Sequence, residues 1–333
     1  MLRKSLLCAA SLLFASGCGD DAGSSEDTFR DGLPSKEMMQ VKAPKEDGQG
    51  LTSSGPSAMF GQGQKSEYYQ ATVNAAVTVN GGTAWVLTLI EQIVKHPPTT
   101  LEENKAVWGP HTDALSPTTW RLTVTKSGDA SFSWVLDGKA KVDPDSAFKA
   151  VLSGAQTVTV DADGERQRGY GSGELFIDWD AAHGLPDADP KTVGTAEIRY
   201  SRLNATAETT VEADFRQVRD EKNPERRMDG DYRYKATSTG GELDFAFRQD
   251  IDKDSQRTAL ERVSIKSRWT ATGAGRADVR VSEGDLKAPA TFNECWDANF
   301  LSTYFQFAAD VPLGYGREET ACGSFTSAVY SSL

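Results

Sequence analysis

Along most of the chain after residue 105, side chains alternate between apolar and polar, and this pattern limits the possible folds more than any other feature. A period of two places apolar residues on one side of an extended strand and polar residues on the other. Gly-Asp, Asp-Gly and Gly-Gly steps, which are typical of hairpins, lie between the alternating segments. The pattern predicts an antiparallel sheet with one side facing water. The apolar positions are Trp120, Leu122, Val124; Phe132, Trp134, Leu136; Leu175, Ile177, Trp179; Ala196, Ile198, Tyr200; Val211, Ala213, Phe215; Tyr232, Tyr234, Ala236; Leu243, Phe245, Phe247; Val263, Ile265; and Ala277, Val279, Val281.

The polar sides of four consecutive segments alternate in charge sign, which bears on the order of the strands. Unlike charges on neighbouring strands attract, whereas like charges directly opposite one another repel. The alternation therefore predicts a meander in which each strand pairs with the next one along the chain. The charged groups are, in order, Glu208, Glu212 and Asp214; Arg233 and Lys235; Glu242 and Asp244; and Arg262, Lys266 and Arg268.

A long helical pattern comes before the strands. Ser66 is a suitable N-cap, and Pro97 and Pro98 end the pattern. Apolar residues recur at steps of three and four, which predicts either one helix over 66–96 or two helices broken at Gly81-Gly82. We interpret it as a core helix; the alternative is an amphipathic helix that faces lipid. The predicted fold class is mainly β: a curved antiparallel meander sheet, about 105–283, forming a half-barrel packed around one long N-terminal helix.

The amino terminus has the features of an exported precursor. Arg3 and Lys4 precede an apolar run over 6–14 that is too short to span a bilayer. The following Ala15-Ser16-Gly17-Cys18 resembles the lipobox of bacterial lipoproteins. The resemblance implies that residues 1–17 are a removed signal peptide and that Cys18 carries the lipid. A plain secretory signal peptide is the alternative.

Residues 18–65 are predicted to form a lipidated cysteine followed by an unstructured tether. From Gly19 to Lys65 the chain is rich in Gly, Ser, Asp, Glu, Pro and Gln and nearly free of aromatic residues. Such a composition buries too little apolar surface to offset the entropy lost on ordering. A single folded domain is expected over 66–333. A random coil as long as this tether spans roughly 40 Å root-mean-square.

Two cysteines remain after export, Cys295 and Cys322. An even pair in an oxidising compartment predicts a disulfide, which would staple a C-terminal segment over 284–333. Two free thiols or a metal pair are the alternatives.

One loop has the oxygen spacing of a calcium site. Asp250, Asp252, Asp254 and Glu261 occupy positions one, three, five and twelve of an EF-hand loop. Ser255 stands at the sixth position, where the turn requires glycine, and the flanking residues are predicted strands. A solvated turn is the competing interpretation, and no other cofactor is expected.

The predicted helix followed by one-sided strands resembles the half-barrel of lipoprotein carriers (LolA-like), in which a sheet closes over helices around an acyl-binding cavity. This resemblance covers roughly 66–283 and supplies no matching functional residues. The stretches "VWGPHTD", "GAGRADVRV" and "NECWD" are similar to an uncharacterised family of bacterial lipoproteins, which implies no activity.

The functional expectation follows from the predicted anchor and body. We expect a cell-envelope lipoprotein, attached to the membrane by its lipid, that binds a lipid or other apolar ligand. The alternative is a structural or interaction lipoprotein with a solid core.

No catalytic motif is recognised, so a non-enzymatic protein is predicted. After loss of the two basic signal residues, 48 acidic residues face 34 basic ones, and a charge near −14 disfavours nucleic acid. Gly19, directly after Cys18, favours the outer over the inner membrane.

Overall fold

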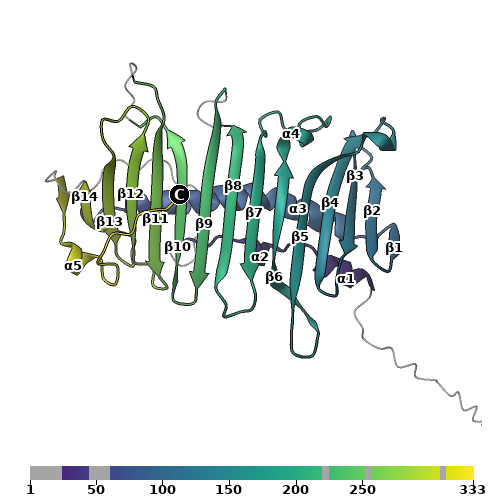
Figure 1. Cartoon of the computed structure of the whole chain (residues 1–333), viewed down its shortest axis with the longest axis horizontal. Coiled ribbons are helices and arrows are strands. Elements are labelled where there is room, and N and C mark those ends of the chain that lie inside the picture. Colours follow the sequence, from purple (N-terminus) through teal and green to yellow (C-terminus); the bar gives the residue numbers. More distant parts are fainter. Residues whose placement is uncertain (1–24, 45–60, 220–224, 252–256, 308–312) are drawn as a thin grey trace, which may run out of the picture.

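The computed structural model describes residues 25–44, 61–219, 225–251, 257–307 and 313–333. Fifteen antiparallel strands form one open sheet in which each strand pairs with its neighbours in sequence (Figure 1). The predicted meander and the mainly β fold class are confirmed. The strands are β1 Thr100–Glu102, β2 Lys105–His111, β3 Thr118–Lys126, β4 Ser131–Ala140, β5 Lys149–Val160, β6 Arg166–Asp178, β7 Thr195–Arg202, β8 Thr209–Arg219, β9 Arg227–Thr237, β10 Gly240–Gln249, β11 Glu261–Thr270, β12 Gly275–Glu283, β13 Ala290–Trp296, β14 Ser302–Phe307 and β15 Leu313–Tyr315.

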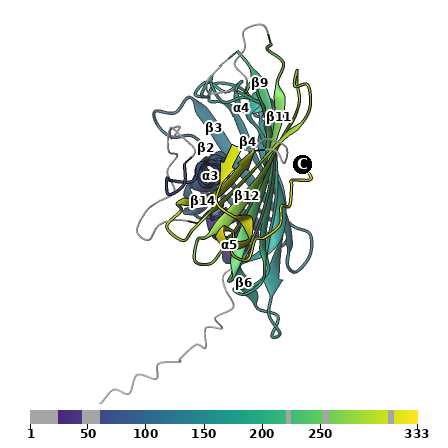
Figure 2. The same ribbon diagram turned by 90° about the vertical axis from the view of Figure 1, so that its left-hand side faces the viewer.

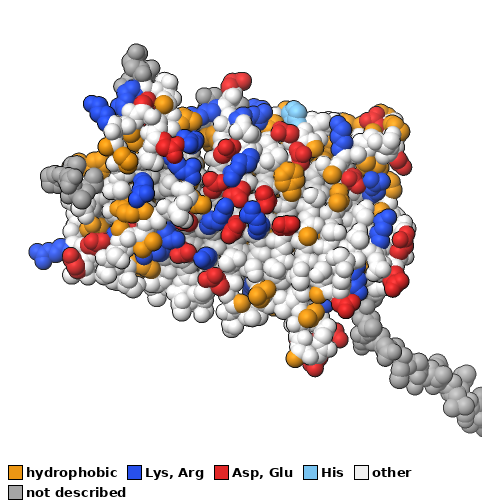
Figure 3. All heavy atoms as spheres, in the orientation of Figure 1, with side chains coloured by type: hydrophobic (Ala, Val, Ile, Leu, Met, Phe, Trp, Pro, Cys, Tyr) orange, Lys and Arg blue, Asp and Glu red, His pale blue; other side chains and the backbone are white. Residues whose placement is uncertain are grey.

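The charge alternation predicted the strand order correctly, and the register shows why. Glu212 lies opposite Arg233 on β8 and β9, while Asp244 on β10 lies opposite both Arg233 and Lys266. Arg233 donates to Asp214 at 2.7 Å, and Lys266 lies 3.4 Å from Glu242. Figure 3 shows acidic and basic side chains gathered over β7–β9 on the outer face, defined as the side of the sheet away from the long helix.

One continuous helix, α3 (Glu67–Val94), lies along the opposite, inner face (Figure 2). The Ser66 hydroxyl accepts from the Tyr69 N–H, as expected of an N-cap. Gly82 does not break the helix: a Cβ there would lie 3.0 Å from the Phe215 ring, so glycine permits the helix to approach β8 closely. By length and composition α3 could also cross a membrane, although several of its side chains are fully buried against the sheet.

The prediction of an unstructured tether over 18–65 is wrong for residues 25–44. This segment forms α1 (Ser25–Asp31), which contacts β2, β3 and β6, and α2 (Lys36–Met39), which packs beside α3. Its few apolar side chains are almost completely buried. The composition of this segment did not predict its order, because its apolar side chains are buried against the inner face of a sheet that other parts of the chain form. The buried apolar residues are Phe29, Leu33, Met38, Met39, Val41 and Ala43.

The sheet also extends beyond the predicted limit at 283, because β13, β14 and β15 lie in the segment that was expected to be only disulfide-stapled. Residues 293–296 are buried on both faces, so the period-two pattern disappears from the sequence there. The second face is covered by the chain end after α5 (Glu318–Ala321), which runs over the outer face of β11 and β12. Two short helical turns complete the fold, the 3-10 turn Asp145–Ala147 and α4 (Trp179–Ala182).

Candidate functional site

The middle of the space between α3 and the sheet is filled by side chains. Val79 and Val86 of α3 are 0% exposed, and so are Ile198 and Leu243 of the sheet. An internal cavity large enough for water would expose the side chains that line it. Among the described residues, no ligand-sized space therefore adjoins these four side chains, in contrast to a half-barrel with an open acyl cavity.

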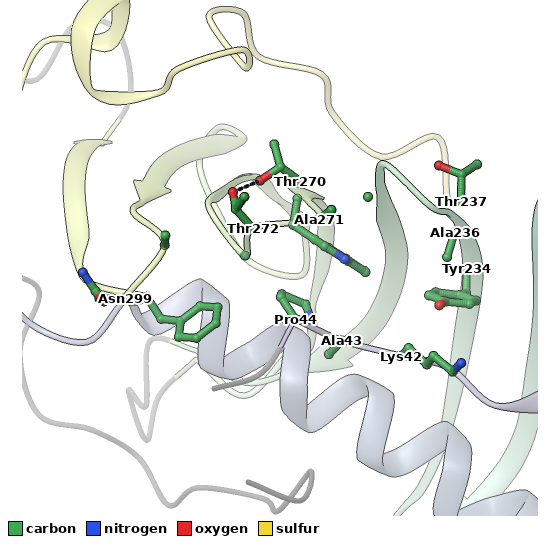
Figure 4. Close-up of a pocket in the computed structure, with 15 residues that line it drawn as sticks. Lys42, Ala43, Pro44, Tyr234, Ala236, Thr237, Thr270, Ala271, Thr272 and Asn299 are labelled. Atoms are coloured by element: carbon green, nitrogen blue, oxygen red, sulfur yellow. Dashed lines mark hydrogen bonds between the residues drawn. The ribbon is translucent and has the colours of Figure 1, made fainter. Parts of the chain in front are cut away.

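A pocket of about 580 Å³ lies instead where hairpin turns at the ends of the strands meet residues 42–44 (Figure 4). We call it the rim pocket. The turn between β9 and β10 and the turn between β11 and β12 form one side, and residues 42–44 form the other. Its volume is within the range of roughly 300–1,000 Å³ that is usual for small-ligand sites. Its lining residues are Lys42, Ala43, Pro44, Tyr234, Ala236, Thr237, Gly240, Trp269, Thr270, Ala271, Thr272, Gly273, Ala298, Asn299 and Phe300.

The rim pocket combines an aromatic floor with a polar rim. Tyr234, Trp269 and Phe300 are nearly buried beneath it, and the Tyr234 and Trp269 rings stack with centroids 6.5 Å apart. Thr270 and Thr272 share a 2.9 Å hydrogen bond on one side of the pocket, opposite Pro44 (Figure 4). Desolvation by burial raises the pKa of Tyr234 to about 12, so its phenol remains protonated at neutral pH. This is the arrangement expected for a ligand with an apolar body and a polar end.

A second, shallower hollow of about 420 Å³ lies at the far end of the inner face, and we call it the edge groove. It exists because alternate positions of β13, β14 and β15 face the same way: Phe292 pairs with Phe307, and Phe307 pairs with Leu313. The Phe292 and Phe307 rings are 4.7 Å apart, and Leu313 is 60% exposed. Its lining is Phe292, Phe305, Phe307, Leu313, Gly314 and Tyr315.

Glu294 of β13 is a buried carboxylate that binds the amino-terminal end of α3. It accepts from the Ser66 hydroxyl at 2.8 Å and from the Tyr68 N–H at 2.9 Å. An anion at this position is favoured by the free N–H groups and the dipole of the helix. Burial nevertheless raises the pKa of the Glu294 carboxyl, although the hydrogen bonds to it act in the opposite direction. This contact fixes the helix to the last strands of the sheet.

The raised pKa of Glu294 predicts a pH-dependent contribution to stability. The folded state holds the proton more tightly than the unfolded state, so the contribution is complete below the ordinary carboxyl pKa, about 4.3, and is lost as the pH rises through the folded value. The free energy of unfolding of the wild type, relative to Glu294→Gln, is therefore expected to fall as the pH rises above the ordinary carboxyl pKa, measured by urea titrations at a series of pH values. The exposed Glu319→Gln serves as the control. A relative stability that rises with pH would contradict the prediction.

A cluster of buried charged side chains, centred on Asp278, lies on the outer face beneath the C-terminal segment that follows α5. Asp278 is 0% exposed and accepts four hydrogen bonds, which satisfy both carboxylate oxygens. The Arg276 guanidinium donates at 2.6 Å and also binds Glu318 of α5. The donors to Asp278 are Arg276, Asn293, Arg268 and the Val329 N–H. These hydrogen bonds attach the C-terminal segment to the sheet.

The predicted disulfide is present. Cys295 on β13 and Cys322 after α5 are joined, with their Cα atoms 5.3 Å apart. Cys18, the predicted lipid attachment point, lies outside the described residues, so the structure does not test lipidation.

Half of the predicted calcium ligands can be located. Asp252 and Asp254 lie outside the described residues. The Glu261 carboxylate is buried and accepts from the Ile251 N–H at 2.9 Å. Within the described ranges, no three His, Cys, Asp or Glu side chains form a group that could hold a metal ion. Calcium binding stays a prediction.

Asp178 and Asp180 lie on either side of Trp179, and the carboxylates of both accept backbone hydrogen bonds. Asp178 accepts from the Ala181 N–H at the start of α4, and Asp180 accepts from the Gly194 N–H.

No pattern in the sequence predicted the rim pocket. Its polar residues come from hairpin turns and from the segment that was interpreted as a tether, and no spacing connects them. Comparison of the chain with protein-family models, curated proteins and solved structures finds no match.

Proposed function

We propose that this protein is a lipid-anchored cell-envelope protein, attached through Cys18 and not an enzyme, that binds a lipid or other largely apolar ligand at the rim pocket. The observation that carries the proposal is the combination of an aromatic floor, a rim of threonine hydroxyls and an adequate volume between the two layers. Lys42 is the one charged residue among the described lining residues. A single cation favours a ligand whose polar end is neutral or anionic.

The filled centre of the helix–sheet layer supports a different candidate, a structural or interaction lipoprotein with a solid core. The two candidates predict different results for protein purified intact from its own envelope. Native mass spectrometry of a binding protein should detect a co-purified small molecule, whereas a structural lipoprotein should show only the mass of the acylated chain.

The site is tested with a fluorescent long-chain fatty acid as the probe. Ala271 is exposed in the turn between β11 and β12 and lines the rim pocket, so Ala271→Trp should occupy the cavity without disturbing the core. We expect the affinity of this variant to fall by about tenfold or more, which corresponds to about 1.4 kcal/mol. The matched control is Ala288→Trp, at an exposed position that does not line the pocket.

The edge groove is tested in the same assay. Leu313→Glu places a charge at the mouth of the groove, where burying the charge against a ligand would be costly. Probe binding that is lost in Leu313→Glu and retained in Ala271→Trp would assign the ligand to the edge groove and contradict the rim pocket. Equal binding by all variants would contradict both sites.

A further inference from the structure

The position of α1 determines how close the folded body lies to the proposed anchor. Ser25, the first residue of α1, is only seven residue steps from Cys18. A fully extended chain covers at most about 3.6 Å per step, so these steps span no more than about 25 Å. The stretch of chain between Cys18 and α1 is therefore far shorter than a tether that continues to Ser66.

The attachment of α1 to the body rests on apolar packing and on hydrogen bonds. The Phe29 ring is buried and meets the Phe132 ring edge-on, with centroids 6.4 Å apart. Gly32 lies so close to the same ring that a Cβ would overlap it. Arg30 donates to the Val94 and His96 carbonyls at the end of α3 and so caps the carboxyl end of that helix.

Hydrogen bonds from side chains of β5 and β6 also hold α1 to the sheet. Arg166 and Arg168 at the start of β6 both donate to the Asp31 carboxylate. Gln156 of β5 donates to the Asp31 carbonyl at 2.9 Å. The helix thus contacts one end of the sheet, near β2, β3 and β6, which lies at the lower right of Figure 1.

The opposite end of the sheet is far from this point. α5 lies against β14, eleven strands along from β3. At about 4.8 Å between neighbouring strands, this is roughly 50 Å along the sheet.

We infer that the end of the sheet at α1 and the β3–β4 turn is the membrane-facing surface, and that the disulfide-linked end around α5 projects away from the bilayer. The inference rests on the proposed lipid anchor at Cys18. Its partner is the lipid headgroup surface itself. The segment 25–44 therefore does more than fill the core. Because α1 packs against the sheet, only the residues before α1 separate the anchor from the body, instead of a tether that spans roughly 40 Å. The body is thereby held close to the membrane.

The test measures the distance of two sites from the membrane in the full-length acylated protein, reconstituted in vesicles that contain an acceptor-labelled headgroup. Single cysteines for a donor dye replace Asp129, which is fully exposed in the β3–β4 turn, or Glu319, which is exposed in α5. The native disulfide and the acylated Cys18 leave no other thiol for labelling, because Cys8 is removed with the signal peptide. We expect a strong loss of donor emission at position 129 and little loss at position 319.

Two variants test whether the short chain before α1 and the packing of α1 are what keep position 129 close to the membrane. A long Gly-Ser insertion after Ser24 should reduce the loss at position 129, and so should Phe29→Ala combined with Arg30→Ala, which releases α1. Equal loss at both positions, or greater loss at position 319, would overturn the orientation while leaving the anchor in place. Emission that is unchanged at both positions and identical in Cys18→Ala would overturn the anchor, and this inference with it.

Discussion

Replacement of Ile90 by aspartate is expected to lower the free energy of unfolding more than any other single change at the surface of α3. Ile90 lies on the sheet-facing side of α3 and is 3% exposed. The substitution removes the transfer free energy of a buried aliphatic side chain and places an unpaired carboxylate in an apolar core. Losses of this kind exceed about 4 kcal/mol, a large fraction of the 5–15 kcal/mol that stabilises an ordinary domain. The measurement is the urea midpoint, followed by tryptophan fluorescence.

The control for this variant is Thr88→Asp, two residues earlier on the solvent-facing side of the same helix. It should change the free energy of unfolding by about 0.5 kcal/mol or less. A wild-type midpoint for Ile90→Asp would mean that this face of α3 is not core, and would favour the alternative in which the helix contacts lipid.

The second large effect is expected for Asp278→Ala. The substitution deprives Arg276, which is 1% exposed, of one of its two carboxylate partners and leaves a buried guanidinium with only Glu318 as an acidic partner. Removing one member of a buried ion pair costs about 3–5 kcal/mol, because the remaining charge is left uncompensated. The Val329 N–H also loses its acceptor, so the chain end should detach from the outer face.

Both consequences of Asp278→Ala can be measured. The urea midpoint should fall, and limited proteolysis should cleave the chain after Cys322 at protease concentrations that leave the wild type intact. The control is Asp129→Ala, which removes an exposed carboxylate 3.6 Å from Lys126 and should have little effect. If Asp278→Ala behaved like this control, the buried cluster would not be what attaches the C-terminal segment.

The features that were predictable from the sequence are those in which local pattern and environment agree. The alternation in β3–β12 is visible because one face meets the core and the other meets water. Ser66 acts as the N-cap because a hydroxyl before a helical pattern has a free N–H to bind. Opposite charges predicted the strand order because Glu212, Arg233 and Asp244 occupy facing positions of adjacent strands.

The features that were missed depend on contacts made at long range. β13 lacks a visible period because Asn293 and Cys295 on its outer side are covered by the chain end. The rim pocket draws its walls from residues 42–44 and from turns near 237, 271 and 299. No spacing in the sequence brings those positions together.

The sequence alone determined the class of the fold, the long helix, the order of the strands and the cysteine pair, because periodicity, charge sign and residue type act over short distances. Only the tertiary structure decided that residues 25–44 are ordered, that the sheet continues to Tyr315 and that a pocket lies at the rim. Phe29, Met38 and Val41 are too few to order an isolated segment. They become core residues because the sheet offers an apolar face that α3 covers only in part, and burial there offsets the entropy lost on ordering.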